Sequence, residues 1–343
     1  MTEREILAPL VRVAVSRRTR PALIGAIMAM LSVWPFAFAD AGVSFRTQIG
    51  HQSAPFRLVA DEGTLAQAQA AYQAGNVATA RRIWVALADH GDLEAQYQLG
   101  VFSETQGSNN DFAEAAAWYA KAAASKYAPA QRNLAMLYES GRGVPQDNAT
   151  ARDWYGKAAA LGDAQALTHL GIMQYRGLGG ARDIPSSVDS FTQAAKLGVA
   201  RAQFDLGTMY ETGKGVTADP ATAASWYRQA ANQNYAPALS GLGLLFAKGL
   251  GVKLDLTVSH DNFRRAAELG DARGEYYLAV DYRLGKGVPV DTVAALRWFA
   301  IAGGHGNIDA VKQRNELMNE MSKPDVEKAL RQAEDWQPRV VKK

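Results

Sequence analysis

The chain has 343 residues, no cysteine, and 37 Lys and Arg residues against 34 Asp and Glu residues. The lack of cysteine excludes a disulfide framework, a thiol nucleophile, an iron–sulfur cluster and a cysteine zinc site. A chain of this length is expected to form two or three domains, unless an internal repeat builds one long array.

Residues 1–39 have the pattern of an export signal. Basic residues, all of them arginine, precede an apolar run over residues 22–39, and this run ends in the small-residue motif Ala37-Phe38-Ala39. The pattern predicts a signal peptide that is cleaved before Asp40, or before Gly42 in a second register. The alternative is a retained membrane anchor, because an apolar run of this length also spans a bilayer.

The excess of positive charge lies in this first segment. Removing residues 1–39 takes away five basic and two acidic side chains, which leaves 37 − 5 = 32 basic and 34 − 2 = 32 acidic residues. Nucleic-acid binding requires a basic surface, and a chain with balanced charge has no overall basic excess to provide one. We therefore expect no nucleic-acid partner.

The central part of the chain repeats with a period of 36 residues. Two series of glycines, one series of aspartates and one series of tryptophans recur at this spacing. The glycines are Gly141, Gly177, Gly213, Gly249 and Gly285, followed two residues later by Gly143, Gly179, Gly215, Gly251 and Gly287. The aspartates are Asp147, Asp183, Asp219, Asp255 and Asp291, and the tryptophans are Trp118, Trp154, Trp226 and Trp298. So many positions in register predict one array of structural repeats.

Each unit contains two stretches with the periodicity of an amphipathic helix. In one unit, Ala202, Leu206 and Tyr210 fall on one face of the first stretch, and residues 223–231 give the second a broad apolar stripe. The Gly-x-Gly segment between them is expected to end the first helix, because glycine adopts positive φ without steric cost. Gly207 lies where the facing helix is expected to come close.

This pattern resembles the Sel-1-like repeat, a relative of the tetratricopeptide repeat. Residues 202–231 match A-x-x-x-L-G-x-x-Y-x-x-G-x-G-V-x-x-D-x-x-x-A-x-x-W-Y-x-x-A-A at nearly every marked position. The resemblance covers residues 92–303 as six units. It implies an all-α fold, a right-handed superhelical α-solenoid of helix-turn-helix repeats. The third unit departs from the pattern, because Gly180 replaces valine and Tyr175 moves the aromatic residue by one position.

The segments on either side of the six units are expected to differ from them. Residues 40–60 show no periodicity and are predicted to be a flexible linker, with a partner-binding peptide as the alternative. Residues 61–91 resemble a shorter, tetratricopeptide-type N-terminal hairpin. Residues 304–336 are predicted to form C-terminal capping helices, and 337–343 a tail. Repeat arrays need such atypical ends to cover an otherwise exposed apolar face.

The sequence shows no motif for catalysis or metal binding. The Gly-x-Gly segments follow helices, whereas phosphate-binding loops follow strands. The repeated aspartates precede the second helix, where a carboxylate caps free backbone N–H groups. The five histidines lack metal-ligand spacing, and no G-x-S-x-G segment occurs. We therefore expect no enzyme activity, no cofactor and no metal, and we expect the repeated tryptophans to form the core.

The candidate site is the concave face, which the first helices of stacked hairpins line. Counted from the consensus alanine of each first helix, the third position holds Tyr97, Arg132, Thr168, Phe204, Ser240 and Tyr276. The tenth position holds Glu104, Glu139, Tyr175, Glu211, Ala247 and Arg283. Exposed aromatic residues and arginines anchor protein interfaces. We predict that Tyr97, Arg132, Phe204, Tyr276 and Arg283 bind a partner.

The resemblance implies an interaction scaffold. Exported Sel-1-like repeat proteins of Gram-negative bacteria include periplasmic regulators of sensor kinases, envelope-assembly scaffolds and host-interaction factors. We therefore expect a periplasmic or secreted adaptor that binds a protein or peptide of the cell envelope on its concave face. One alternative is an inner-membrane-anchored scaffold that retains residues 22–39. Another is a β-lactam or cell-wall hydrolase, although the relatives associated with β-lactams have a disulfide in each repeat, and this chain has none.

Overall fold

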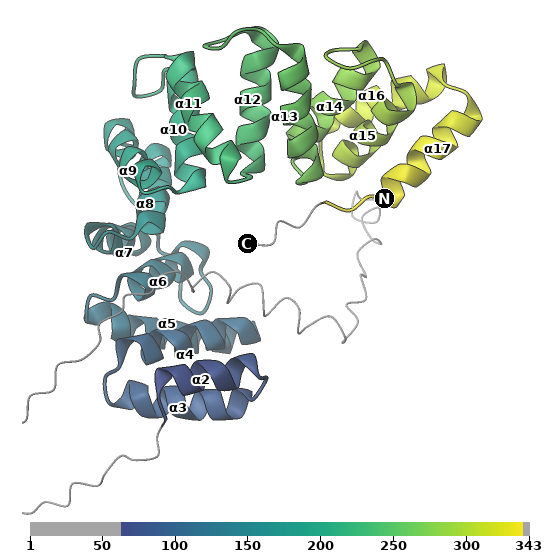
Figure 1. The fold of residues 1–343 in the computed structure, drawn as a ribbon. Coiled ribbons are helices and arrows are strands. Elements are labelled where there is room, and N and C mark those ends of the chain that lie inside the picture. Colours follow the sequence, from purple (N-terminus) through teal and green to yellow (C-terminus); the bar gives the residue numbers. More distant parts are fainter. Residues whose placement is uncertain (1–62, 339–343) are drawn as a thin grey trace, which may run out of the picture.

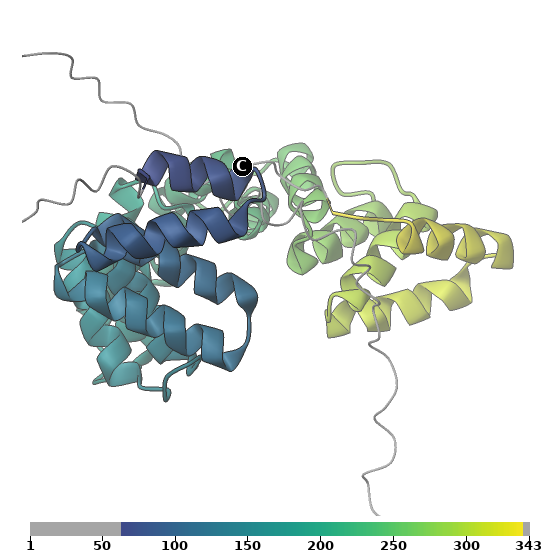
Figure 2. The same ribbon diagram turned by 90° about the horizontal axis from the view of Figure 1, so that it is seen from below.

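The computed structural model describes residues 63–338, which form sixteen helices and no β-strand. Each helix packs mainly on the helices that precede and follow it, except α17, which packs on α15. The helices build an arc that begins with α2 and α3 and ends with α16 and α17 (Figure 1). Seen from below, the N-terminal and C-terminal helices form two separate groups (Figure 2). The predicted all-α solenoid of helix-turn-helix repeats is confirmed.

Each of six successive units contains a first and a second helix. The first helices are α4 (Leu93–Gln106), α6 (Ala128–Ser140), α8 (Ala164–Arg176), α10 (Ala200–Thr212), α12 (Ala236–Lys248) and α14 (Ala272–Leu284). The second helices are α5 (Asn109–Ala124), α7 (Asn148–Ala160), α9 (Ile184–Lys196), α11 (Pro220–Asn232), α13 (Leu256–Glu268) and α15 (Thr292–Gly304). The flanking helices are α2 (Leu65–Gln73), α3 (Val77–Asp89), α16 (Ile308–Glu320) and α17 (Lys323–Glu334). In Figure 1, α6, α8 and α10 lie on the inner side of the bend, and α7, α9 and α11 on the outer side.

The repeated aspartates cap the second helices, as predicted. In α13, for example, the Asp255 carboxylate accepts a hydrogen bond of 3.0 Å from the backbone N–H of Val258. A side-chain hydrogen bond from Thr222 is the largest of the contacts that hold the pKa of Asp219 below its usual value. These carboxylates satisfy backbone donors that have no partner within the helix.

The two glycines of each Gly-x-Gly segment have different roles. The first, such as Gly249 with φ +65°, ends the first helix in the left-handed conformation, as the sequence predicts. The second also has positive φ, and it lies against the backbone of the preceding unit in every segment except that of Gly215, where side chains are nearest. A Cβ on Gly251 would lie 2.2 Å from the carbonyl carbon of Pro220 at the start of α11. This glycine therefore determines how closely successive units approach.

An aromatic ring in each second helix forms the centre of the unit, but it is not the predicted tryptophan. The buried rings are Tyr119, Tyr155, Phe191, Tyr227, Phe263 and Phe299, each one residue after the tryptophan position. Trp118, Trp154 and Trp226 are only partly buried, and Trp298 alone of the four is buried. The prediction of a tryptophan core is wrong for these three. The helix turns by about 100° per residue, so neighbours cannot both point at the facing helix.

Small residues on the first helices make room for these rings. A Cβ on Gly207 would lie 2.8 Å from the ring of Tyr227, which confirms the predicted close approach. A Cβ on Gly100 would lie 2.4 Å from the ring of Tyr119.

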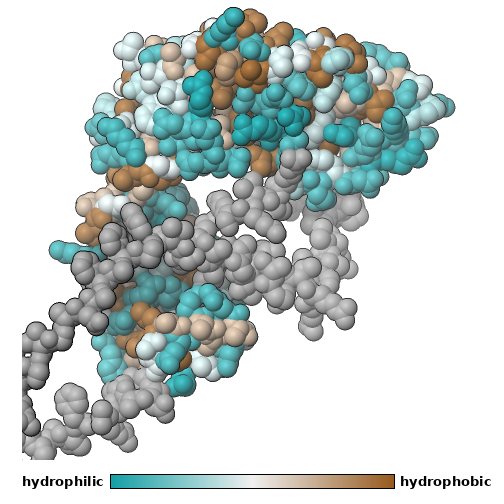
Figure 3. Space-filling model, in the orientation of Figure 1, coloured by the Kyte–Doolittle hydropathy of each residue, from teal (hydrophilic) through white to brown (hydrophobic). Residues whose placement is uncertain are grey.

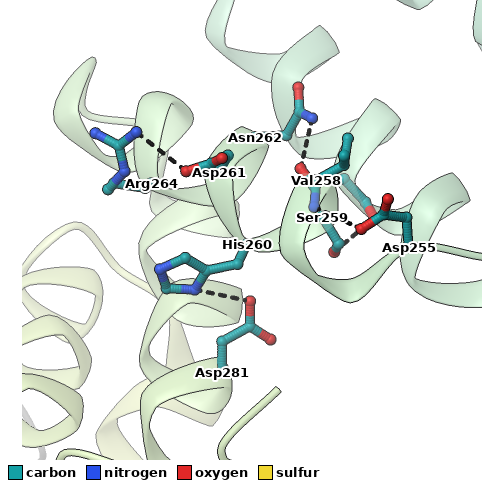
Figure 4. A network of polar contacts seen from close by, with 9 residues as sticks. Asp255, Val258, Ser259, His260, Asp261, Asn262, Arg264 and Asp281 are labelled. Carbon is teal, nitrogen blue, oxygen red and sulfur yellow. Dashed lines mark hydrogen bonds and ion pairs between the residues drawn. The ribbon is translucent and has the colours of Figure 1, made fainter. Parts of the chain in front are cut away.

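A buried polar pair joins α13 to α14. His260 points from α13 towards Asp281 on α14 (Figure 4), and the His260 Nδ1 and Asp281 Oδ2 atoms are 3.4 Å apart. Both side chains are less than one tenth exposed. Burial raises the pKa of Asp281, and the contact with His260 opposes that rise. The pair thus places an ionisable group where its charge is costly.

Candidate interaction surface

The third-position aromatic residues do not form a free surface. Tyr97 is only 6% exposed and packs between Tyr119 and the next unit's Tyr127, with ring centroids 5.8 and 5.6 Å away. The expectation that Tyr97 is exposed is therefore wrong. Its position lies at the junction of two units, where each first helix meets the start of the next.

Phe204 and Tyr276 have the same kind of surroundings and are partly buried. The ring of Phe204 lies 5.5 Å from that of Tyr227. The ring of Tyr276 lies 5.2 Å from that of Tyr277 and 5.9 Å from that of Phe299. These rings extend the cores of their units, so their main contacts are internal.

The two predicted arginines also bind within the chain. Arg132 donates a hydrogen bond to Gln165 and lies 3.7 Å from Asp163, so it connects α6 with the start of α8. Arg283 donates hydrogen bonds to Gln313 and Glu320 of α16. Its guanidinium also lies 3.7 Å from the Glu316 carboxylate. Arg283 therefore attaches α16 to the end of the repeats.

The tenth-position glutamates are partners of the core tyrosines. The hydroxyl groups of Tyr119, Tyr155 and Tyr227 donate hydrogen bonds of 2.6 to 2.7 Å to Glu104, Glu139 and Glu211. The remaining units have phenylalanine as the core ring and no glutamate at the tenth position. Burial raises the pKa of Glu104, whereas the contact with His169, whose Nδ1 lies 3.7 Å from the carboxylate, is the main cause that lowers the pKa of Glu139. The pairing was visible in the sequence as a correlation between two repeat positions.

A hollow remains on the inner face between α8 and α10, with a volume of about 150 Å³. Buried Phe191 and Met209 and partly buried Ile172 line it with apolar surface. The other lining residues are Tyr175, Arg176, Arg201, Asp205, Thr208, Thr212 and Lys214. None of the five predicted binding residues belongs to this set. The hollow corresponds in the sequence to the irregular third unit, where Tyr175 takes the place of a glutamate.

Positive charge dominates the rim of this hollow. Arg176 and Lys214 are exposed, and neither side chain forms a hydrogen bond or an ion pair within residues 63–338. Arg201 forms an ion pair of 2.9 Å with Asp205. Burial raises the pKa of Asp205, with Arg201 opposing the shift. Hydrophilic residues also dominate the inward edge of the arm formed by α10–α17 (Figure 3).

A second hollow of about 410 Å³ lies beside the ends of α5 and α7. Gln131, which lines it, is 3% exposed and donates a hydrogen bond of 3.0 Å to the Ala123 carbonyl. Its Oε1 has no partner in the described part of the chain. In the fourth unit the equivalent Gln203 accepts a hydrogen bond from Gln233. Leu161 occupies the position of Gln233 here, so the donor is lacking.

The described residues contain no group of three or more His, Cys, Asp or Glu side chains placed to hold a metal ion. Between residues 63 and 338, no helix has both the length and the apolar character needed to span a membrane. The predicted signal or anchor within residues 1–39 and the predicted linker over 40–60 lie outside the described residues.

The comparisons identify related proteins by sequence and by fold. The family model "Sel1 repeat" matches residues 93–127, 128–163, 164–199, 200–235, 236–271 and 272–307. One similar structure is a protective antigen of uropathogenic Escherichia coli strains with an SLR fold. It has 33% identity and a TM-score of 0.65, and the match covers 74% of this chain and 56% of that one. A Sel1 repeat protein from Oxalobacter formigenes has 28% identity and a TM-score of 0.62, over 71% of this chain and 99% of that one. Among curated proteins, no sequence matches the chain.

The helical hairpins and the inner face define a repeat solenoid of the kind that binds other macromolecules. The chain belongs to the Sel1 repeat family. Proteins of this family generally act as scaffolds for protein–protein interactions and typically are not enzymes. The chain spans 56% of the length of the E. coli protein that it matches.

Proposed function

We propose that this protein is exported and acts in the periplasm as a scaffold or adaptor that binds a protein or peptide on its inner face. In this role it regulates an envelope protein or assists envelope assembly. The observation that carries the proposal is the hollow between α8 and α10, which combines an apolar floor with basic groups that have no internal partner.

Export is supported by the sequence of residues 1–39, with its arginines, apolar run and A-x-A motif. The similarity to a protective antigen supports the same proposal, because a protective antigen is accessible to the immune system. Fractionation of cells and N-terminal sequencing of the native protein test this part. A periplasmic protein that starts at Asp40 or Gly42 is expected, and a membrane-bound protein that retains residues 22–39 would contradict it.

Partner binding is tested by affinity capture from crosslinked cells with two matched tryptophan variants. Thr212 is exposed at the rim of the hollow on α10, and Ser225 is exposed on the outer helix α11. Thr212→Trp adds bulk to the inner face and is expected to remove an envelope protein that the wild type captures. Ser225→Trp adds the same bulk elsewhere and is expected to retain it. Equal capture by both variants would reject the inner face as the binding surface.

A further inference from the structure

The hollow between α8 and α10 lies where the third unit departs from the polar pair of other units, because Tyr175 and Phe191 both line it. In the first, second and fourth units, a tyrosine hydroxyl and a glutamate meet at this place and close it with a hydrogen bond. The third unit has Phe191 without a hydroxyl and Tyr175 without a carboxylate. Neither closes the gap, so the apolar surface of Phe191 and Met209 lines an open hollow.

The size of the hollow favours a side chain over a small-molecule ligand. Sites for drug-sized ligands usually have volumes of about 300–1,000 Å³. A volume of about 150 Å³ is well below that range. One apolar side chain of a bound polypeptide fits this space, and the polypeptide then continues along the inner face.

The charges around the hollow favour an acidic occupant. Arg176 and Lys214 project into solvent, and the Arg201 charge is already matched by Asp205. The Arg176 charge also lowers the pKa of Asp205 and of Glu139 as a minor cause, so two carboxylates of the chain lie within its electrostatic range. Two exposed cations with no ion pair still leave the rim positive.

The last unit shows how such a surface is neutralised within this chain. Arg283 occupies the position equivalent to Tyr175, and the carboxylates of Glu316 and Glu320 in α16 pair with it. Three periods of 36 residues earlier, α10 has Thr208 and Thr212 at the positions of these glutamates. The carboxylates that complete the contact between α14 and α16 are thus absent between α8 and α10, where both threonines line the hollow.

We propose that the hollow between α8 and α10 binds an acidic segment of the partner protein. An apolar side chain of the segment fills the space over Phe191 and Met209, while acidic side chains pair with Arg176 and Lys214. The C-terminal residues 339–343 of this chain are a poor occupant, because they contain three basic residues and no acidic one. The inference rests on the proposed function and specifies the chemistry of the partner.

Fluorescence anisotropy with three labelled dodecapeptides tests the inference directly. The first peptide alternates glutamate with leucine, the second has lysine in place of glutamate, and the third has serine in place of leucine. The first peptide is expected to bind most tightly. Its affinity is expected to fall as salt is added, because salt screens exposed charges. Equal affinity for the glutamate and lysine peptides would overturn the proposal.

Two charge-reversal variants locate the binding. The double variant Arg176→Glu with Lys214→Glu is expected to lower the affinity for the glutamate–leucine peptide by at least about tenfold, which corresponds to about 1.4 kcal/mol. Lys196→Glu with Arg228→Glu changes the net charge equally on the outer helices α9 and α11, and it is expected to leave affinity unchanged. Equal loss in both variants would show a general charge effect and overturn the site.

The same variants separate this inference from the proposed function. If Thr212→Trp abolishes capture of the envelope protein while Arg176→Glu with Lys214→Glu retains it, the inner face binds a partner without acidic recognition. That result would overturn only the inference. If neither variant affects capture, both the inference and the proposed function fail.

Discussion

Gly251→Ala is expected to destabilise the protein much more than a substitution at an ordinary glycine. Gly251 has φ +66°, and a Cβ there would lie 2.2 Å from the Pro220 carbonyl carbon and 2.3 Å from the Ala221 nitrogen. Left-handed backbone costs an L-residue about 1–2 kcal/mol. Overpacking adds about 1–3 kcal/mol, because the atoms that must move belong to the backbone of α11. We expect a total loss of roughly 2–5 kcal/mol.

Two other glycines separate the causes of this loss. Gly162 has φ +86° but nothing within 4 Å of a Cβ, so Gly162→Ala is expected to lose only the backbone term of about 1–2 kcal/mol. Gly156 lies within α7 and also has open space, so Gly156→Ala is expected to stabilise by about 0.5–1 kcal/mol. Urea unfolding followed by circular dichroism at 222 nm gives all three values. If Gly251→Ala were no more destabilising than Gly162→Ala, the close contact between units would not exist.

Three further predictions concern packing and charge. Phe204→Ala is expected to destabilise by roughly 2 kcal/mol in urea unfolding, less than the about 3–5 kcal/mol of a fully buried phenylalanine; an unchanged midpoint would mean that the ring is free surface. Leu161→Gln is expected to stabilise by about 0.5–1.5 kcal/mol by donating to Gln131, and a loss of stability would refute that pairing. The pKa of Asp281 is raised in the folded state, so protonation of this carboxyl stabilises the folded state. The gain in the free energy of unfolding is complete below the unfolded-state pKa and is lost as pH rises through the folded-state pKa. Asp281→Asn should therefore lose stability relative to wild type as pH falls through this window, and a constant difference would contradict the assignment.

The features that depend on local chemistry were predictable from the sequence. An aspartate before a helix and a glycine after one act through their own backbone neighbours, so Asp255 and Gly249 have the predicted roles. The close approach at Gly207 was also predicted, because a helix interior disfavours glycine unless packing requires it.

The features that depend on contacts between units were not predictable from the period alone. Tyr97 lies on a first helix, but the next unit covers it, and the spacing of two units is not a property of one unit's pattern. Whether Trp154 or Tyr155 is the core ring depends on the rotation of the helix about its axis by one residue. The broad apolar stripe does not determine this rotation. The pairing of Glu139 with Tyr155 was available as a correlation across the units.

The candidate site therefore lies in an irregular unit and not at the regular repeat positions. The regular third-position residues bind their neighbours, whereas the third unit's departures at Tyr175 and Phe191 leave a hollow. At Tyr175 the departure from the pattern removes the carboxylate that pairs with the core ring in the first, second and fourth units. Unlike Arg283, which pairs with α16, the third unit therefore keeps an open surface at this position.

The proposed contact between the inner face at α8 and α10 and a partner in the cell envelope can be tested in living cells. The most direct measurement is photocrosslinking in living cells, with a photoreactive phenylalanine at Thr212 or, as control, at Ser225 on α11. We expect a specific crosslinked envelope protein from Thr212 and none from Ser225, with the crosslinked segment rich in Asp and Glu. Crosslinks that are equal at both positions, or found only at Ser225, would contradict the proposed contact.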